Sequence, residues 1–326
     1  MWPLPARETK TKSQFQSLKV RALQILFLGL GVLGAGILSA CAPSIRPVIK
    51  IGLVAPFEGR YREIGEEIIY AVRLAVREAN KAGGVDGYSV ELMAFDDGGD
   101  PAQAEEQARK LGTDPQVVGV IGDWLEATTL TAAPVFASAG IPFLATTASP
   151  DLEPSAFRLW YSESDYAFAA SPAAACPLPC EPAENLDWLK AHENGDFPVI
   201  GPAIWGLNQF GRLAGEAGEG VHIVAPAPLP ADSTDPSFDE RYRAISPGPE
   251  PRFLAVLAYD AAQLLFEAVE RDAKLNKLPT RSGVGAALIQ SDYAGLSGHF
   301  SFDSNRDWVE GKGWVYQWRE GKLIRP

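Results

Sequence analysis

The feature that most constrains this chain is an alternation of short apolar runs with helical segments, which starts near residue 48. The runs are rich in branched side chains, as expected of strands buried on both faces of a parallel sheet. They stand at 49–54, 89–95, 117–121 and 141–145. The segments between them predict helices over 62–80, from Asp100 onward and over 128–139. Parallel strands joined by helices predict a doubly wound α/β sheet.

The alternation restarts after residue 160 and predicts a second α/β unit. Strands are expected at 173–177, 199–200, 221–224, 299–302 and 314–318, with helices at 183–192, 206–214 and 254–268. The fold class predicted is α/β, with two doubly wound parallel-sheet lobes joined by a multi-strand hinge. Lobe one is expected to comprise 49–160 plus 253–310, and lobe two 161–252 plus 311–326.

The amino terminus has the layout of a secretory signal, because Lys19 and Arg21 precede an uncharged stretch over 22–40. The stretch ends in Leu38-Ser39-Ala40-Cys41, which resembles a bacterial lipobox. We therefore expect a lipoprotein signal peptide over 1–40, lipidation of Cys41, a tether over 41–48 and an extracytoplasmic body anchored to the cell membrane. The alternative is an uncleaved membrane anchor, since the run is near the length that spans a bilayer.

Charge and motifs exclude several classes of function. The formal net charge is −12, and so acidic a chain repels nucleic-acid phosphates. The sequence has no phosphate loop, no nucleophile elbow and no zinc-ligand spacing among its Cys and His residues. We therefore expect no enzyme activity, no cofactor and no metal. An extended Cys176-Pro-Leu-Pro-Cys180 run separates its ends by about 13 Å, so these thiols are expected to be unbridged.

Five motifs in the first half occur in a characteristic order. They are Ala55-Pro56-Phe57-Glu58-Gly59, Glu78 to Gly87, Asp96-Asp97-Gly98-Gly99-Asp100-Pro101, Gly119-Val120-Ile121-Gly122 and Ala148-Ser149-Pro150-Asp151-Leu152. In this order they resemble the first lobe of the leucine/isoleucine/valine-binding proteins, which are type I periplasmic binding proteins. Shorter matches follow at Gly201-Pro202, Tyr259-Asp260-Ala261 and Gly295-Leu296-Ser297-Gly298.

The resemblance implies the ligand-capturing component of an ABC importer. Two lobes would close on a small amino-acid-like, amide or amine solute, and the closed form would meet permease subunits in the membrane. The alternative is a lipid-anchored sensing or protein-interaction module on the same fold, without a transported ligand.

The residues expected at the ligand site depart from the family pattern. Glu126 stands where the family has a Ser for the ligand carboxylate, and Ala203 stands where it has an acid for the ligand ammonium. The candidate ligand-binding residues are Glu58, Trp124, Glu126, Thr146, Thr147, Ser149 and Trp205. Two acids at one site favour an amine-bearing or neutral amide-like ligand. Two interpretations stay open: Glu126 as a helix-terminus residue, and both Trp residues as packing.

Length is the second departure from the family. The segment that soon follows Tyr161 resembles a later strand and loop of the family's second lobe, so the part that normally precedes them is missing. Roughly 60–70 residues, about two strand–helix–strand units, are therefore expected to be absent relative to the family. We therefore expect lobe two to be reduced.

Overall fold

The computed structural model describes residues 46–147, 149, 151–161, 174–175, 183–192, 198–248 and 250–326. Cys41, Cys176 and Cys180 lie outside the described residues, so their predicted chemistry stays a prediction. Residues 47–326 form one compact unit. No helix within the described part of the chain is long and apolar enough to cross a membrane.

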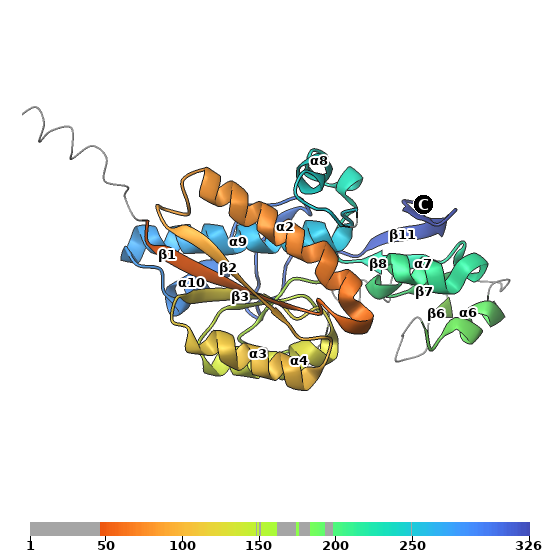
Figure 1. Ribbon diagram of the computed structural model, residues 1–326, viewed down its shortest axis with the longest axis horizontal. Coiled ribbons are helices and arrows are strands. Elements are labelled where there is room, and N and C mark those ends of the chain that lie inside the picture. The colour runs from red at the N-terminus through yellow and green to blue at the C-terminus, as the bar shows by residue number, and fades with distance from the viewer. Residues whose placement is uncertain are drawn as a thin grey trace, which may run out of the picture. The chain divides into compact units, whose positions relative to one another are not determined.

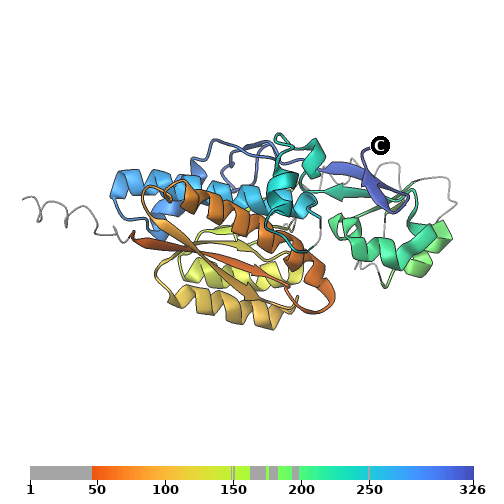
Figure 2. The same ribbon diagram turned by 45° about the horizontal axis from the view of Figure 1, so that its top comes forward.

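Lobe one is built on a five-stranded parallel sheet of order β2-β1-β3-β4-β5. Its strands are β1 (Val48–Ala55), β2 (Ser89–Asp96), β3 (Val117–Gly122), β4 (Phe143–Ala145) and β5 (Phe157–Arg158). The helices α2 (Arg62–Lys81) and α9 (Phe253–Asn276) cover one face, while α3 (Pro101–Thr113) and α4 (Glu126–Ser138) cover the other (Figure 1; Figure 2). The doubly wound sheet predicted from the alternating pattern is confirmed.

The two faces of the lobe-one sheet have separate cores because successive strand residues point to opposite sides. Ile51 and Leu53 of β1 pack with the α2 and α9 side, and Val54 packs with the α3 and α4 side. All three side chains are fully buried. The predicted cap of α3 is present, since the Asp100 carboxylate accepts a hydrogen bond of 2.9 Å from the Gln103 amide.

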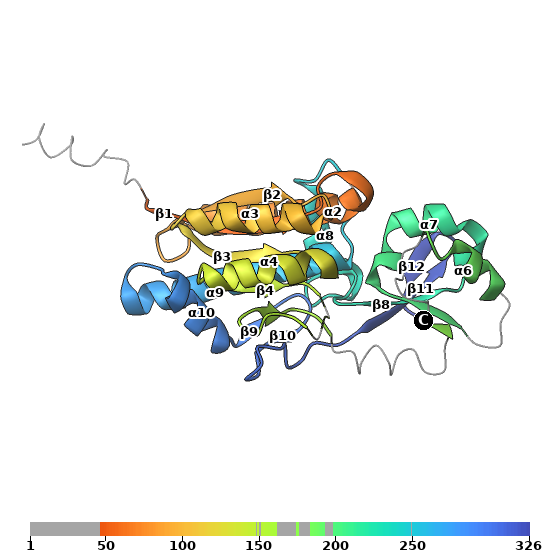
Figure 3. The same ribbon diagram turned by 90° about the horizontal axis from the view of Figure 1, so that it is seen from below.

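Lobe two is built on a second five-stranded sheet of order β12-β11-β8-β7-β6 (Figure 3). Its strands are β6 (Ala174–Ala175), β7 (Val199–Gly201), β8 (His222–Ala225), β11 (Trp314–Arg319) and β12 (Lys322–Ile324). Strands β6, β7 and β8 are parallel, whereas β11 runs antiparallel to β8, and β12 runs antiparallel to β11. The sheet is therefore mixed and not wholly parallel, because the chain's last segment returns to it and closes with a tight turn at Glu320-Gly321.

Short helices accompany the strands of lobe two. They are α6 (Leu186–His192) and α7 (Asn208–Ala214), with the 3-10 turns η3 (Ala203–Gly206) and η4 (Gly215–Gly218). The amino terminus of α7 is capped from lobe one. Both carboxylate oxygens of Glu63 in α2 accept hydrogen bonds of 2.8 Å, one from the Asn208 amide and one from the Gln209 amide. An acid at this position also complements the helix dipole.

The connection from β8 to α9 lies largely on lobe one. It contains η5 (Pro230–Asp232) and α8 (Phe238–Arg243), and the Tyr242 hydroxyl donates a 2.8 Å hydrogen bond to the Glu67 carbonyl in α2. The boundary expected at 252/253 is therefore displaced, because the buried side chains of α8 find their apolar partners on α2 and α9.

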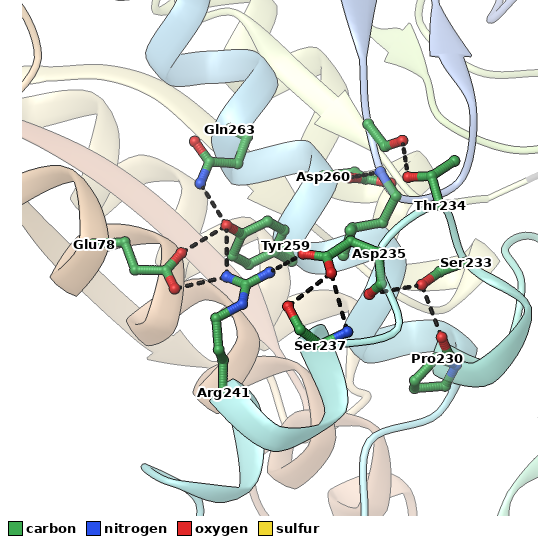
Figure 4. Close-up of polar contacts among 12 residues, drawn as sticks. Glu78, Pro230, Ser233, Thr234, Asp235, Ser237, Arg241, Tyr259, Asp260 and Gln263 are labelled. Atoms are coloured by element: carbon green, nitrogen blue, oxygen red, sulfur yellow. Dashed lines mark hydrogen bonds and ion pairs between the residues drawn. The ribbon is translucent and has the colours of Figure 1, made fainter.

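Figure 4 shows the polar network that holds this connection. The Arg241 guanidinium donates to Glu78 of α2 at 2.6 Å and to Asp235 at 2.9 Å. The Tyr259 hydroxyl of α9 donates to the other Glu78 oxygen at 2.6 Å, and Gln263 donates to Tyr259 at 2.9 Å. Two helices and one connection thus share a single set of charge-assisted hydrogen bonds.

The last part of lobe one contains α10 (Arg281–Ile289) and the two-stranded antiparallel pair β9 (Tyr293–Ala294) and β10 (His299–Phe300). The Asp260 carboxylate in α9 is buried and accepts hydrogen bonds of 2.7 and 2.8 Å from the amides of Leu296 and Ser297. The tight turn before the final crossing to lobe two is thereby fixed to α9.

Candidate functional site

The carboxyl ends of β1, β3 and β4 meet at one edge of the lobe-one sheet, because the three strands are parallel and adjacent. Open α/β sheets bind ligands at this edge. Here β1 is followed by Pro56 to Glu58, β3 by Asp123 to Glu126, and β4 by Thr146 and Thr147. The topology therefore brings the lobe-one candidate residues to one edge.

Backbone geometry fixes the turn that follows β3. Gly122 has a φ of 142°, and a Cβ at this position would lie 2.3 Å from the Val54 carbonyl oxygen, so only glycine fits. The next carbonyl, that of Asp123, accepts hydrogen bonds from the hydroxyls of Thr129 at 2.5 Å and Thr146 at 3.2 Å. Thr146 is therefore one link in the framework that joins the ends of β3 and β4.

Two acids that the sequence analysis missed lie beneath this edge. Asp97 follows β2 and Asp123 follows β3, and both side chains are fully buried. Burial raises the pKa of Asp123 well above its ordinary value, and the neighbouring Asp97 carboxyl raises it further. Burial also raises the pKa of Asp97, against a hydrogen bond from the Gly99 amide that lowers it. Asp97 Oδ2 and both carboxyl oxygens of Asp123 have no hydrogen-bond partner, so burial favours a protonated form of the pair.

A pattern in the sequence marks this pair. Asp96-Asp97 and Asp123 each stand directly after an apolar run, so parallel pairing puts them at the same end of the sheet. Asp96 has a structural role, since its carboxylate accepts hydrogen bonds from the amides of Phe57 at 2.7 Å and Gly98 at 3.0 Å.

The loop after β4 supplies buried hydroxyl groups. Thr146, Thr147 and Ser149 are 1%, 7% and 4% exposed. The Ser149 hydroxyl has no hydrogen-bond partner, and its carbonyl accepts a 2.9 Å hydrogen bond from Arg158, which also pairs with Asp307. A buried hydroxyl without a partner is available to a ligand.

Glu58 and Glu126 are exposed, in contrast to the buried residues between them. Glu126 is the first residue of α4, where a carboxylate also favours the helix dipole. The amide of Glu58 donates to Asp96, which ties the loop after β1 to the loop after β2. Both acids thus stand at the rim of the edge with their carboxylates in solvent.

The two tryptophans have different surroundings. Trp124 is 6% exposed, and its indole N–H has no acceptor. Trp205 is fully buried in lobe two, stacked on Phe210 at 4.8 Å, and its carbonyl accepts a 2.8 Å hydrogen bond from the Trp318 indole. The expectation that Trp205 faces the lobe-one residues is therefore corrected, because its ring is enclosed by an aromatic core.

Among the described residues, no cluster of three or more Asp, Glu, His or Cys side chains could hold a metal ion. The edge instead offers one unused indole donor, one unused hydroxyl, a buried acid pair and two solvated acids. This is a set of groups for holding a polar or cationic solute, and it contains no nucleophile activated by a base.

Comparison with known proteins relates this arrangement to one family. Residues 48–176 match the family model described as periplasmic binding protein. The chain is 34% identical over 114 residues to the Leu/Ile/Val-binding protein BraC3 of Rhizobium johnstonii, which covers 35% of this chain and 31% of the relative. The matched segments thus span about a third of that relative's length.

Solved structures share the fold over most of the chain. An ABC transporter substrate-binding protein of Desulfitobacterium hafniense, in complex with Leu, has a TM-score of 0.68 at 18% identity and covers 86% of this chain and 100% of its own. A solute-binding protein of an ABC transporter from R. palustris, in complex with benzoate, has a TM-score of 0.66 at 20% identity and covers 85% and 95%. Residues 48–176 are thus similar to the periplasmic binding protein family, and the chain shares its fold with solved substrate-binding proteins of ABC transporters.

Proposed function

We propose that the protein is the extracytoplasmic solute-binding component of an ABC importer and that it captures a small amino-acid-like, amide or amine solute between its lobes. The observation that carries the proposal is the edge formed by the ends of β3 and β4, where buried hydroxyls and an unused indole donor lie. The names of the relatives and of the solved structures support the same activity, which is binding and not catalysis.

The charge of the edge favours a ligand with a cationic or neutral polar end. Glu58 and Glu126 are solvated acids at its rim, and the Asp97–Asp123 pair adds negative charge below it whenever fewer than two protons are bound. Acids on one edge of an acidic protein attract cations and repel anions. A free carboxylate held at this edge would lie close to these acids, so we expect amines or amides to bind more tightly than simple carboxylates.

Calorimetric titration of the whole chain with leucine, putrescine and a short amide tests the proposal. We expect at least one of the last two to bind and to raise the melting temperature, because a ligand at 100 times its Kd stabilises by about 2.7 kcal/mol. Failure of all such solutes to bind would favour the alternative, a sensing or interaction module on the same fold.

Glu126→Gln tests the role of the rim acid. If Glu126 contacts a cationic group, the variant should weaken putrescine binding by about 1.5–3 kcal/mol, the worth of a charge-assisted hydrogen bond. Glu58→Gln is the matched control, since it removes the same charge from the same rim. Tight leucine binding that is unchanged in Glu126→Gln would assign Glu126 to the helix terminus alone.

Anchoring at Cys41 is part of the proposal and rests on the lipobox alone. We expect intact-mass analysis to show a lipidated chain that begins at Cys41, and Cys41→Ser to abolish the modification. An unmodified mature chain that begins elsewhere would overturn this part without touching the binding activity.

A further inference from the structure

A cavity of about 310 Å³ lies in lobe one, away from the edge described above. It is lined by the end of α4, the residues before β4, the start of β5 and the outer face of α10. Because β4 has only three residues, its carboxyl end carries Thr146 while its amino end, at Ile141 and Pro142, forms a wall of the cavity. The cavity and the candidate ligand site are thus at opposite ends of one strand.

The floor and walls of the cavity are mostly apolar. Ile141, Pro142, Phe157 and Ile289 line it, and Ile289 has 47% of its surface exposed at the rim. Small-molecule sites typically combine apolar walls with a few convergent polar groups, in volumes from about 300 Å³ upward. The apolar part of this description is met, so the polar groups decide what the cavity could hold.

Two guanidinium groups line the cavity, and neither is paired with a carboxylate. Arg281 donates only to backbone carbonyls, those of Val117 at 3.0 Å, Ala139 at 2.9 Å, Gly112 at 3.2 Å and Asp114 at 2.6 Å. Arg306 donates to the Ser155 carbonyl and lies 5.0 Å from the centre of the Phe157 ring.

Both cations belong to a chain whose formal net charge is −12. Most of the Arg281 donors bind carbonyls at the ends of α3 and α4, which offsets part of its charge. Arg306 has no such helix terminus, whereas the positive amino terminus of α10 is offset by the buried Asp272 carboxylate, which accepts a 2.8 Å hydrogen bond from the Thr280 amide. Because the Asp114 carboxylate also offsets the charge of Arg281, the positive charge of the cavity comes mainly from Arg306.

We propose that this cavity binds a small amphipathic carboxylate, whose acid group meets Arg306 and Ser282 while its apolar part lies against Phe157 and Ile141. An Arg guanidinium over an aromatic ring presents its N–H groups outward in the plane that matches a carboxylate. The site is independent of the solute site between the lobes, since it uses none of that site's residues.

The experiment titrates hexanoate into the whole chain labelled with ¹³C on the isoleucine methyl groups. We expect the signals of Ile141 and Ile289 to shift, with hexylamine at the same concentration leaving them unmoved. Because these methyls line this cavity alone, binding of hexanoate between the lobes gives a different set of shifts. Hexylamine moving the same methyls as strongly as hexanoate would overturn the charge assignment.

Ser282→Asp is the decisive variant. It adds a carboxylate at an exposed residue in the first turn of α10, and this carboxylate repels the bound one. We expect hexanoate binding to weaken at least tenfold, with Ser282→Asn as the uncharged control that keeps most of the affinity. Ala286→Phe, which fills the cavity from the exposed side of α10, should abolish the shifts. Equal hexanoate affinity in Ser282→Asp and in the unmodified chain, or no shift of Ile141 and Ile289 up to solubility, would overturn the proposal.

Discussion

Lobe one and lobe two reach a buried core by different means. In lobe one, aliphatic strands lie between two layers of long helices, and Ile51, Leu53 and Ile121 have no exposed surface. In lobe two, α6 and α7 have seven residues each, and the largest core side chains are aromatic. Trp205, Phe210 and Trp318 stack in sequence there, with ring centres 4.8 and 5.9 Å apart.

The difference teaches how short elements can still enclose a core. An aromatic side chain buries roughly 150–250 Å², so a few of them replace many aliphatic residues. As a consequence, much of the buried area of lobe two comes from a few side chains, and the loss of any one of them should destabilise that lobe strongly. Lobe one instead spreads its burial over many aliphatic side chains and over separate aromatic ones, such as the fully buried Phe136, Phe143 and Phe157.

Trp205→Ala should produce the largest difference in stability between the two lobes. Removal of a fully buried indole from a packed core costs about 3–5 kcal/mol. We expect hydrogen exchange to quicken throughout β7, β8 and α7 while β1 and β3 keep their protection. Denaturant unfolding followed by exchange and mass spectrometry measures both.

Phe136→Ala is the counterpart in lobe one. Its ring is fully buried and packs on Phe143 at 4.8 Å, so a loss of similar size is expected, with exchange quickened around α4 and β4 instead. Equal loss of protection in both lobes for each variant would show that the two lobes unfold as one cooperative unit and would end the contrast.

The joint between the lobes should respond to pH through Glu67. This carboxyl is buried where α9 begins, accepts hydrogen bonds from the amides of Arg252 at 3.0 Å and Ala255 at 2.8 Å, and burial raises its pKa from 4.5 to about 7. The native state therefore favours the protonated form. Its contribution to the free energy of unfolding is complete below pH 4.5 and is lost as the pH rises through about 7, by roughly 3 kcal/mol.

Glu67→Gln tests this assignment because both amides donate to the same oxygen, which Gln retains. We expect urea titrations between pH 4.5 and 8 to lose most of their slope with pH in this variant. A weaker slope should remain from Asp260, whose pKa burial raises to about 6 in the same direction. An unchanged slope in Glu67→Gln would assign the pH dependence to other buried acids, Asp97 and Asp123 first.

A smaller effect is expected from Arg241, which ties the lobe-two-to-lobe-one connection to α2 and α9. Its side chain is 31% exposed, so solvent screens its pairs and Arg241→Ala should cost only about 1–2 kcal/mol. Exchange should quicken in α8 and not in either sheet. Arg243→Ala is the control, because its ion pairs are local and 46% exposed, and it should change stability by less than about 0.5 kcal/mol.

The sequence predicted the elements of lobe one well, because each apolar run there is long enough to be recognised as a strand and is followed by a clear helix pattern. Asp100 and Pro101 mark the start of α3 by local chemistry that no tertiary contact overrides. The helix α8 was missed, since it has six residues and its place is decided by contacts with α2. The strand at 314–318 was predicted and is β11, but its antiparallel direction and the strand β12 were not, because strand direction depends on which sheet the chain returns to.

The sequence predicted which loops meet at the edge of the lobe-one sheet, but it missed the buried acids Asp97 and Asp123 there. Thr146 and Thr147 could be placed because β4 ends directly before them. Trp205 could not be assigned from the sequence, since an aromatic near a strand end packs inward or faces a ligand according to its distant neighbours, here Phe210 and Trp318. Asp123 was overlooked because its partner Asp97 is 26 residues away in the chain and only the parallel pairing brings them together.

The cap that Glu63 places on α7 has a mechanical consequence. A hydrogen bond of 2.8 Å weakens when its length grows. Here two successive amides at the start of α7 donate such bonds to the same carboxylate, that of Glu63. A swing of one lobe against the other that kept both bonds would turn about an axis close to Asn208. The start of α7 would then be a pivot, and a small rotation there would become a large displacement at the far ends of the lobes.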